Sequence, residues 1–382
     1  MIPYGRQSIS QEDIHAVLAV LSSDFLTQGD QVPAFEQAML NYTGAQFAVA
    51  VNSATSALHL ACLALDLGPD DRLWTTPNTF VASANCGRYC GAEVDFVDID
   101  PTSYNLCCRA LTHKLKQAQQ QGKLPKVVVA VDFAGQPCDW ETLRDLARQY
   151  GFYLIEDASH AVGGTYKGQP IGNSSYADIT VFSFHPVKII TTAEGGMALT
   201  NNAELASRMA RLRSHGITRI EAEMTHEPDG PWYYQQLELG LNYRMTELQA
   251  ALGSSQLQRI DEFVARRRSL AQRYDHVLSG LPLQCPQQHP EGESAFHLYP
   301  IVLQDTSRRL EVFNKLRAAG IGVNVHYIPV HTQPYYQQRG HRIGDYPIAE
   351  AYYAGAISLP LYADLSNEQQ EFIIATLKQV LA

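Results

Sequence analysis

Short, nearly continuous apolar segments alternate along the chain with stretches whose apolar residues recur at helical spacing. Five apolar segments predict β-strands: 47–51, 92–97, 127–132, 152–155 and 179–183. Residues 53–65 and 143–150 carry the helical spacing. Strands that are apolar throughout are typical of a parallel sheet covered by helices on both faces. This part of the chain is therefore predicted to be an α/β domain with a mostly parallel sheet.

The pattern changes near Thr246. Four further elements are predicted after it, in the order helix, strand, helix and strand, followed by a closing helix. Their ranges are 247–278 (one long helix), 296–303, 308–319, 323–327 and 368–381. This order is typical of a smaller α+β unit. We therefore expect a large domain over residues 1–245, with an N-terminal arm, and a C-terminal α+β domain over residues 246–382.

Composition and charge argue against nucleic acid and membranes as binding partners. The 382 residues include 29 Lys plus Arg and 39 Asp plus Glu, a net charge of −10, and no basic run that would hold a nucleic acid backbone. No stretch approaches the ~20 apolar residues of a membrane span, and the first residues lack the apolar core of a signal peptide. We expect a soluble, cytoplasmic protein that binds neither nucleic acid nor membrane.

The cysteines and histidines do not predict a metal centre. The seven Cys follow neither a zinc pattern nor a disulfide framework, which is typical of a reducing compartment. His326 and His331 could form a ligand pair, but no H-E-x-x-H or carboxylate-bearing repeat supports them. We expect no metal in the site.

Two polar residues follow predicted strands closely. Asp157 comes directly after the apolar run 152–155 and Glu156, and ligands bind at the carboxyl ends of strands in such sheets. Lys188 follows the strand 179–183 in a turn-rich segment, where desolvation would lower its pKa and supply the neutral amine that a Schiff base requires. Taken alone, Asp157 could be a turn or capping residue and Lys188 a surface lysine.

Two further segments offer a possible phosphate site and a possible stacking ring. Asn52-Ser-Ala-Thr55 places small hydroxyl residues at the start of a helix after a strand, where free backbone amides can hold a phosphate. Thr76-Pro-Asn-Thr-Phe80 offers an aromatic ring for stacking, although Phe80 could equally be core. In this order, a phosphate cradle, a stacking ring, a carboxylate and a Schiff-base lysine are the parts that hold pyridoxal 5′-phosphate (PLP).

Several longer segments resemble one family. NSATSALHLA, TTPNTFVASAN, IEDASHAVGG, SFHPVKIITTAEGGM, RSHGI and LGLNYRMTELQAALG are similar to the DegT/DnrJ/EryC1/StrS family of sugar aminotransferases, and the resemblance covers essentially the whole chain. It implies the PLP-dependent transferase fold type I. It also implies a homodimer whose active sites are shared between subunits.

The resemblance implies roles for individual residues. Lys188 would form the Schiff base with PLP, and Asp157 would pair with the pyridine nitrogen. His160 stands where many relatives have Gln near the phenolic oxygen of the ring, so its partner atom stays open and a buried structural His is the alternative. The other cofactor contacts implied are Phe80 for stacking, Ala54, Thr55 and Ser183 for the phosphate, and Asn242 reaching the phosphate from the neighbouring subunit.

The nucleotide-sugar site is implied in the same way. The residues that match segments lining it are Tyr4, Phe25, Leu26, Thr27, Ala54, Ser183, Asn242, His326 and Tyr327. The segment 219–236, rich in charge and aromatic residues, is a candidate lid or interface, with an ordinary surface loop as the alternative.

The segments SDFLTQGDQVPAFE, VVAVDFAGQP and VNVHYIPVH resemble the branch of the family that acts in pseudaminic acid synthesis. This implies transfer of an amino group from L-glutamate to C4 of a UDP-4-keto-6-deoxy-N-acetylhexosamine of the altrosamine type. Another nucleotide-sugar 3- or 4-aminotransferase stays open, because the sequence does not determine the regiochemistry. A sugar dehydratase of the same fold would have His in place of Lys188, and a non-catalytic binding protein would have lost Lys188 or Asp157.

Overall fold

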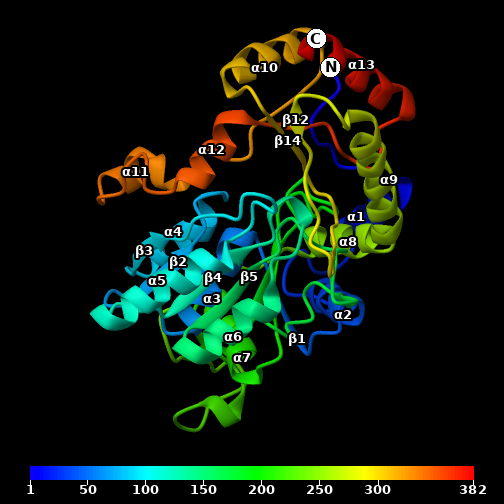
Figure 1. The fold of residues 1–382 in the computed structure, drawn as a ribbon. Helices are drawn as coiled ribbons and strands as arrows, with labels where there is room; N and C mark the ends of the chain where they lie inside the picture. Colours follow the sequence, from blue (N-terminus) through cyan, green and yellow to red (C-terminus); the bar gives the residue numbers. More distant parts are fainter.

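A seven-stranded sheet forms the centre of the larger lobe in the computed structural model, which describes residues 1–382 (Figure 1). The strand order is β1-β9-β8-β5-β4-β2-β3. All strands run parallel except β9, which pairs antiparallel with both β1 and β8. Their bounds are β1 (Phe47–Val51), β2 (Arg72–Thr75), β3 (Glu93–Phe96), β4 (Val127–Val131), β5 (Tyr153–Asp157), β8 (Ile179–Ser183) and β9 (Gly196–Thr200). The predicted mostly parallel sheet is confirmed.

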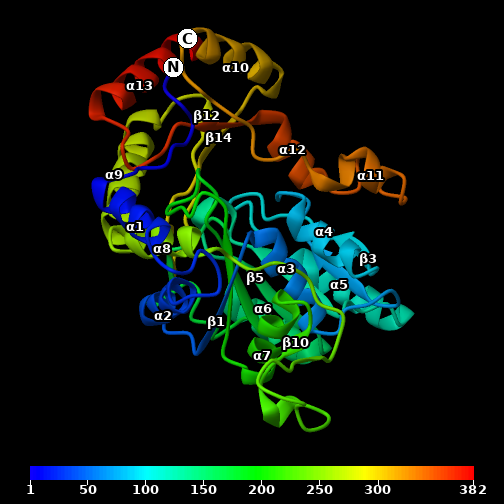
Figure 2. The same cartoon turned by 180° about the vertical axis from the view of Figure 1, so that it is seen from behind.

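Helices cover both faces of this sheet, as Figures 1 and 2 show from opposite sides. Alternate residues of β4 enter two different cores: Val127 and Val129 face one, and Val128 and Ala130 face the other. The first core includes α3 (Ala54–Ala64), α4 (Ala82–Tyr89) and α7 (Ala203–Arg213), and the second includes α2 (Gln31–Thr43), α5 (Cys108–Gln121) and α6 (Trp140–Tyr150). Burial on both faces explains why these strands read as unbroken apolar runs.

The smaller lobe contains a three-stranded antiparallel sheet in the order β12-β14-β15. A separate core of this lobe joins the sheet to the second half of α9 and to two further helices. The bounds are β12 (Leu283–Gln284), β14 (Tyr299–Leu303), β15 (Ala356–Leu359), α9 (Ile260–Leu278), α10 (Arg309–Ala318) and α13 (Asn367–Leu381). The first half of α9 packs into the core of the larger lobe. The domain boundary at Thr246 stays a prediction.

The prediction of one helix over 247–278 is wrong, because the structure has α8 (Glu247–Leu257) and α9, separated by Gln258 and Arg259. Arg259 has φ −110° and ψ 9°, outside helical geometry. Its guanidinium donates to the buried Asp13 carboxylate at 2.7 Å, on α1 (Gln11–Leu21). No Gly or Pro lies at this break, and the contact that accompanies it is distant in sequence.

The predicted strand over 323–327 is also wrong, since this segment makes only an isolated bridge between Asn324 and Ser358. Side chains satisfy its backbone: Tyr352 donates to the His326 carbonyl at 2.8 Å, and the Tyr327 N–H donates to Asn78 Oδ1 at 3.3 Å. The strand that pairs with β14 is β15 instead. The strand predicted from residue 296 begins at Tyr299, after Phe296 adopts a left-handed φ of 49°.

The remaining elements are short strands, helices and turns that connect those described above. They are β6 (Thr165–Tyr166), β7 (Gln169–Pro170), β10 (Ile217–Thr218), β11 (Gln235–Gln236), β13 (Gly292–Glu293), α11 (Pro334–Gln337), α12 (Pro347–Gly355), η1 (Phe133–Gly135), η2 (Glu221–Glu223), η3 (Thr306–Arg308) and η4 (Val330–Thr332). None of the helices combines the length and the apolar character needed to cross a bilayer.

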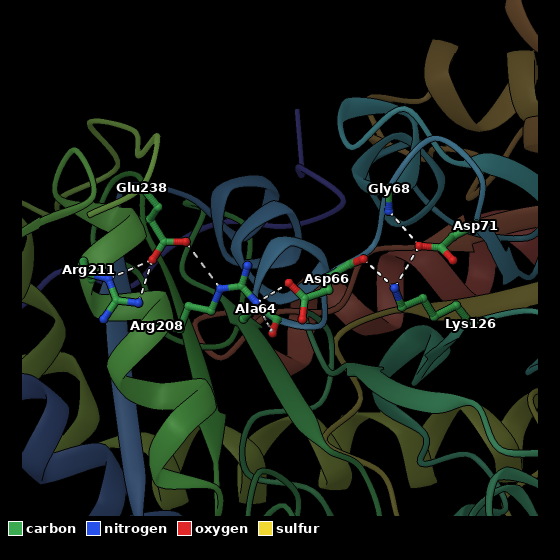
Figure 3. A network of polar contacts seen from close by, with 8 residues as sticks. All are labelled: Ala64, Asp66, Gly68, Asp71, Lys126, Arg208, Arg211 and Glu238. Atoms are coloured by element: carbon green, nitrogen blue, oxygen red, sulfur yellow. Dashed lines mark hydrogen bonds and ion pairs between the residues drawn. The ribbon is translucent and has the colours of Figure 1, made fainter. Parts of the chain in front are cut away.

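The chain between β10 and β11 projects from the larger lobe (Figures 1 and 2). Glu238, just after β11, is held by two arginines of α7, as Figure 3 shows: Arg211 Nη2 lies 2.7 Å from Glu238 Oε1, and Arg208 Nε lies 3.4 Å from Glu238 Oε2. Trp232, three residues before β11, is 75% exposed. The projection is therefore a loop with an exposed aromatic side chain on an ion-paired base.

Candidate active site

A cavity of about 580 Å³ opens at the carboxyl ends of β4, β5 and β8 and reaches the 324–327 segment. This is the sheet edge where ligands of α/β proteins bind. Ten of the residues singled out from the sequence line it: Tyr4, Ala54, Thr55, Phe80, Asp157, His160, Ser183, Lys188, His326 and Tyr327. Four others do not: Phe25, Leu26, Thr27 and Asn242, all of them exposed on the single chain.

Asp157 is the last residue of β5 and is buried. Its Oδ2 accepts a hydrogen bond from Ser83 Oγ at 2.6 Å, and its Oδ1 accepts from Ser159 Oγ at 2.6 Å and from the Ser159 N–H at 3.2 Å. Thr79 Oγ1 bonds Ser83 Oγ at 2.8 Å and so orients it. Donors of this kind favour the ionised carboxylate. A fixed anion at this position suits a cationic ring nitrogen.

Lys188 follows β8 through a turn closed by its own N–H, which donates to the His185 carbonyl at 2.9 Å. The side chain lines the cavity and forms no ion pair. Burial lowers the pKa of the amine to about 8, while the negative charge of Asp157 acts in the opposite direction. A substantial neutral fraction near physiological pH is what a nucleophilic amine requires.

The start of α3 forms an anion cradle at the cavity wall. Ser53 caps the helix, and its Oγ accepts from the Ser56 N–H at 3.1 Å. The N–H groups of Ala54 and Thr55 lie in the first turn, where no helical carbonyl can reach them. A Cβ added to Gly196 of β9 would lie 2.4 Å from the Ala54 nitrogen, so the strand passes this close only as glycine. The cradle fits a phosphate group.

His160 is fixed in one tautomer. Its Nδ1 accepts a hydrogen bond from the Ala134 N–H at 3.2 Å, so the proton of the neutral ring lies on Nε2, which is 3.1 Å from the Tyr327 hydroxyl. Burial, followed by the charges of Lys188 and His326, lowers the pKa of His160 well below its usual range. The ring therefore stays neutral and offers a donor on the cavity side.

Phe80 and His326 are two further residues of the cavity lining. The Phe80 ring is 58% exposed and lies 6.3 Å from the Tyr327 ring, measured between centroids, so one of its faces is free for stacking. His326 Nδ1 lies 2.8 Å from Ser358 Oγ, and burial lowers the pKa of His326 to about 3. His331, the other member of the possible ligand pair, bonds Glu350 instead.

Three of the lining residues that were not singled out from the sequence contact Asp157 or His160 directly. Ser83 and Ser159 hold the Asp157 carboxylate, and His297 places its ring 4.5 Å from that of His160. A serine two residues after an aspartate is a recognised local turn signal, which would have identified Ser159. Ser83 lies 74 residues from Asp157 and His297 lies before β14, so no local pattern identifies either.

Comparison with known proteins agrees with this geometry. The sequence model of the DegT/DnrJ/EryC1/StrS aminotransferase family matches residues 7–378. The spore coat polysaccharide biosynthesis protein SpsC of Bacillus subtilis is 37% identical over 386 residues, covering 100% of this chain and 97% of the relative. A UDP-4-amino-4,6-dideoxy-N-acetyl-beta-L-altrosamine transaminase of Campylobacter jejuni is 37% identical over 392 residues, covering 100% and 98%.

Solved structures are similar over the whole chain. PseC of Helicobacter pylori, an aminotransferase involved in pseudaminic acid biosynthesis, superposes with a TM-score of 0.90 at 31% identity, covering 100% of this chain and 99% of the other. The PLP form of the sugar aminotransferase Spr1654 of Streptococcus pneumoniae gives a TM-score of 0.89 at 31% identity, covering 99% and 98%.

The anion cradle, the free aromatic face, the fixed carboxylate and the partly neutral amine occur together in one cavity, and each fits one part of PLP. The family match over residues 7–378 agrees with that fit. The chain belongs to the DegT/DnrJ/EryC1/StrS aminotransferase family and is a PLP-dependent sugar aminotransferase.

Proposed function

We propose that this enzyme transfers an amino group from L-glutamate to C4 of a UDP-4-keto-6-deoxy-N-acetylhexosamine of the altrosamine type, in pseudaminic acid synthesis. The observation that carries the proposal is the full-length similarity to the Campylobacter transaminase. The likeness to PseC supports it further. The seven free cysteines fit a reducing compartment, so we also propose a cytoplasmic location.

We propose the following roles for the residues of the cavity. PLP, when bound, supplies an electron-accepting ring through which an amino group passes from donor to acceptor. Lys188 Nζ would anchor the cofactor and, as a free amine, would take the proton from the donor Cα and later return one, acting as base and then as acid. Asp157 would hold the positive charge on the ring nitrogen, and His160 would donate from Nε2 toward the phenolic oxygen in place of its present contact with the Tyr327 hydroxyl.

The remaining cofactor contacts follow from the cavity lining. The N–H groups of Ala54 and Thr55 and the hydroxyl of Ser183 would bind the phosphate, and Phe80 would stack on the ring. Tyr4, His326 and Tyr327 line the opposite side, where we place the sugar. Tyr327 contacts both Phe80 and His160, so the sugar pocket adjoins the cofactor pocket directly.

We further propose a homodimer with shared active sites. Phe25, Leu26, Thr27 and Asn242 lie outside the cavity of their own chain and are exposed. Large apolar side chains exposed in this way favour an interface. The projecting loop with Trp232 is a second exposed apolar surface. In such a dimer Asn242 would reach the phosphate bound by the other subunit.

The decisive experiment supplies the purified enzyme with L-glutamate and the UDP-4-keto sugar. We expect 2-oxoglutarate and a 4-amino sugar nucleotide, identified by mass spectrometry and by the NMR couplings at C4. A 3-amino product, or turnover only with a different keto-sugar nucleotide, would reject the proposed substrate and leave the family assignment intact. SpsC, equally similar in sequence, makes these alternatives worth including in the substrate panel.

A further inference from the structure

Two carboxyl groups are buried together on the face of the sheet that α2, α5 and α6 cover. Asp132 follows β4 and is fully buried, and Glu156 on β5 is 5% exposed. In the β4–β5 register Glu156 lies opposite Ala130, so Asp132, two residues further on, lies diagonally across from it on the same face of the sheet, where the two side chains interact. Because side chains alternate along a strand, Glu156 points away from the cavity into which its neighbour Asp157 points.

The hydrogen bonds that the two carboxyls accept from their neighbours do not account for the contact between the carboxyls themselves. Asp132 Oδ1 accepts from the Cys138 N–H at 2.8 Å and from Trp140 Nε1 at 3.1 Å, and Glu156 Oε2 accepts from Thr180 Oγ1 at 2.6 Å. Asp132 Oδ2 is buried and receives no donor. Ionised carboxylate oxygens can only accept, so two such groups make a stable contact only with a proton between them.

No cation compensates the pair. None of the ion pairs in the structure includes Asp132 or Glu156. The titratable groups facing it are the Cys138 thiol and, across a small void beside Glu156, the Tyr166 phenol; burial raises the pKa of both, so they stay neutral. Burial also raises the pKa of both carboxyls, and their mutual repulsion adds to this for Asp132.

The pair is connected to the cavity through the backbone. The Asp132 N–H donates to the Asp157 carbonyl at 3.1 Å. Asp132 also begins the turn Phe133–Gly135, whose Ala134 N–H donates to His160 Nδ1 at 3.2 Å. A shift of Asp132 would therefore move both the end of β5 and the donor that sets the tautomer of His160.

We propose that Asp132 and Glu156 share one proton and form a positioning pair, whose hydrogen bond fixes the strand end carrying Asp157 and the turn that orients His160. The positioning part rests on the cofactor roles proposed above for Asp157 and His160. The shared proton does not depend on them. Neither residue touches substrate or cofactor, so the pair acts only through its neighbours.

The shared proton is tested by infrared spectroscopy of the whole protein near pH 7. Asp132→Asn keeps an oxygen for Cys138 and Trp140, and its amide can donate to Glu156 without a titrating proton. We expect the carbonyl band of a protonated carboxyl in the wild type, and its loss in Asp132→Asn and in Glu156→Gln. Glu141→Gln, which removes an exposed carboxyl of α6, serves as the control and should keep the band. A band that is absent from the wild type, or unchanged in both pair variants, would overturn the shared proton.

The same variants test whether the stability of the folded protein falls as the pH rises. A carboxyl whose folded-state pKa is raised stabilises the protein below its ordinary pKa, and this stabilisation is lost as the pH rises toward the folded value. Between about pH 5 and 7, the unfolding constant of the wild type should rise by up to about tenfold per pH unit relative to Asp132→Asn. The unfolding constants are measured with urea. If those of the wild type and of Asp132→Asn change with pH in the same way, the shared proton is contradicted.

Positioning is tested by PLP affinity of the apoprotein. Asp132→Leu keeps the approximate volume but no hydrogen bond, and we expect it to bind PLP at least about tenfold more weakly. Asp132→Asn should stay within about twofold of the wild type, because it restores the hydrogen bond. Equal affinity of the wild type and of a folded Asp132→Leu would overturn the positioning role. Failure of the wild type to aminate the UDP-4-keto sugar would reject the proposed substrate and leave both of these results unaffected.

Discussion

Lys188 and Asp157 line one cavity from two adjacent strands, β8 and β5, and the charge of Asp157 acts on the Lys188 amine in opposition to burial. Desolvation lowers the pKa of the Lys188 amine to about 8, and the Asp157 carboxylate limits that decrease. The parallel pairing of β5 with β8 places the two residues at the same sheet edge. Several of the predictions below follow from this relationship.

Replacing Lys188 with Ala should reduce turnover by about a thousandfold or more, since the amine that anchors the cofactor and moves the proton is lost. The variant should still bind pyridoxamine 5′-phosphate, because the cradle and Asp157 are untouched. Steady-state assays and cofactor titration measure both effects. Lys116→Ala, at an exposed position of α5, is the matched control and should keep wild-type activity. Wild-type turnover in Lys188→Ala would refute the assignment.

Asp157→Asn should fold normally but lose activity by orders of magnitude, because the fixed negative charge beside the ring nitrogen is worth several kcal/mol, on the order of 3–4, where charge develops in the reaction. Ser83→Ala removes one donor to that carboxylate and should cost only about tenfold. Measurement of kcat in fully PLP-loaded protein distinguishes the two. An unchanged kcat in Asp157→Asn would exclude the proposed role.

The rate at which the apoprotein incorporates PLP should increase with pH through about pH 8, as the Lys188 amine loses its proton. Asp157 raises the pKa of this amine, so Asp157→Asn should move the midpoint to lower pH. Stopped-flow absorbance across pH 6–10 measures both midpoints. A midpoint near that of an ordinary lysine in the wild type would show that the amine is not desolvated.

Gly196→Ala should destabilise the protein and weaken PLP binding, since the new Cβ would lie 2.4 Å from the Ala54 nitrogen. Forcing β9 away from the start of α3 is expected to cost about 2 kcal/mol or more. Gly68→Ala is the control, because its nearest neighbour would be the Asp71 carboxylate at 3.9 Å. Urea unfolding and PLP titration report the two effects, and equal values for both variants would argue against the tight approach.

Mixing inactive subunits tests whether the sites are shared. If Asn242 serves the cavity of the other subunit, dissociation and reassociation of Lys188→Ala with Asn242→Ala should recover about a quarter of the wild-type activity, from the one intact site of each mixed dimer. Each variant reassociated alone is the control. No recovery despite proven mixing would place Asn242 in the site of its own chain, or outside any site.

Local patterns predicted five of the seven strands and singled out Asp157 and Lys188 as candidates, because both depend on segments of a few consecutive residues. The break at Arg259 could not be predicted, since it coincides with a contact to Asp13, 246 residues earlier in the chain. The strands β2 and β9 were not predicted, and the apolar run of β9 leaves no trace of its antiparallel direction.

The residues of the site likewise fall into those that local patterns indicate and those that only the tertiary fold brings together. Asp157 is the last residue of β5 and Lys188 follows β8 after a short turn, so their placement at one edge follows from the order of elements. His297 and Ser83 reach the cavity only through the tertiary fold. The 323–327 segment has the alternation of a strand, yet side chains from α12 and from the loop after β2 satisfy its backbone.

The cavity lining also has a charge balance that bears on its ligands. Its ionisable residues are Lys188, two carboxylates (Asp157 and Glu194), tyrosines and four histidines, and burial lowers the pKa of His160, His185, His297 and His326. Near neutrality one chain therefore presents a single cation, which in the proposed mechanism the cofactor engages, to the proposed donor with two carboxylates and the proposed nucleotide with two phosphates. Backbone amides of α3 can meet one of these anions. The remaining negative charge would need groups from outside this lining, so the proposed association of two subunits would serve electrostatic compensation as well as structure.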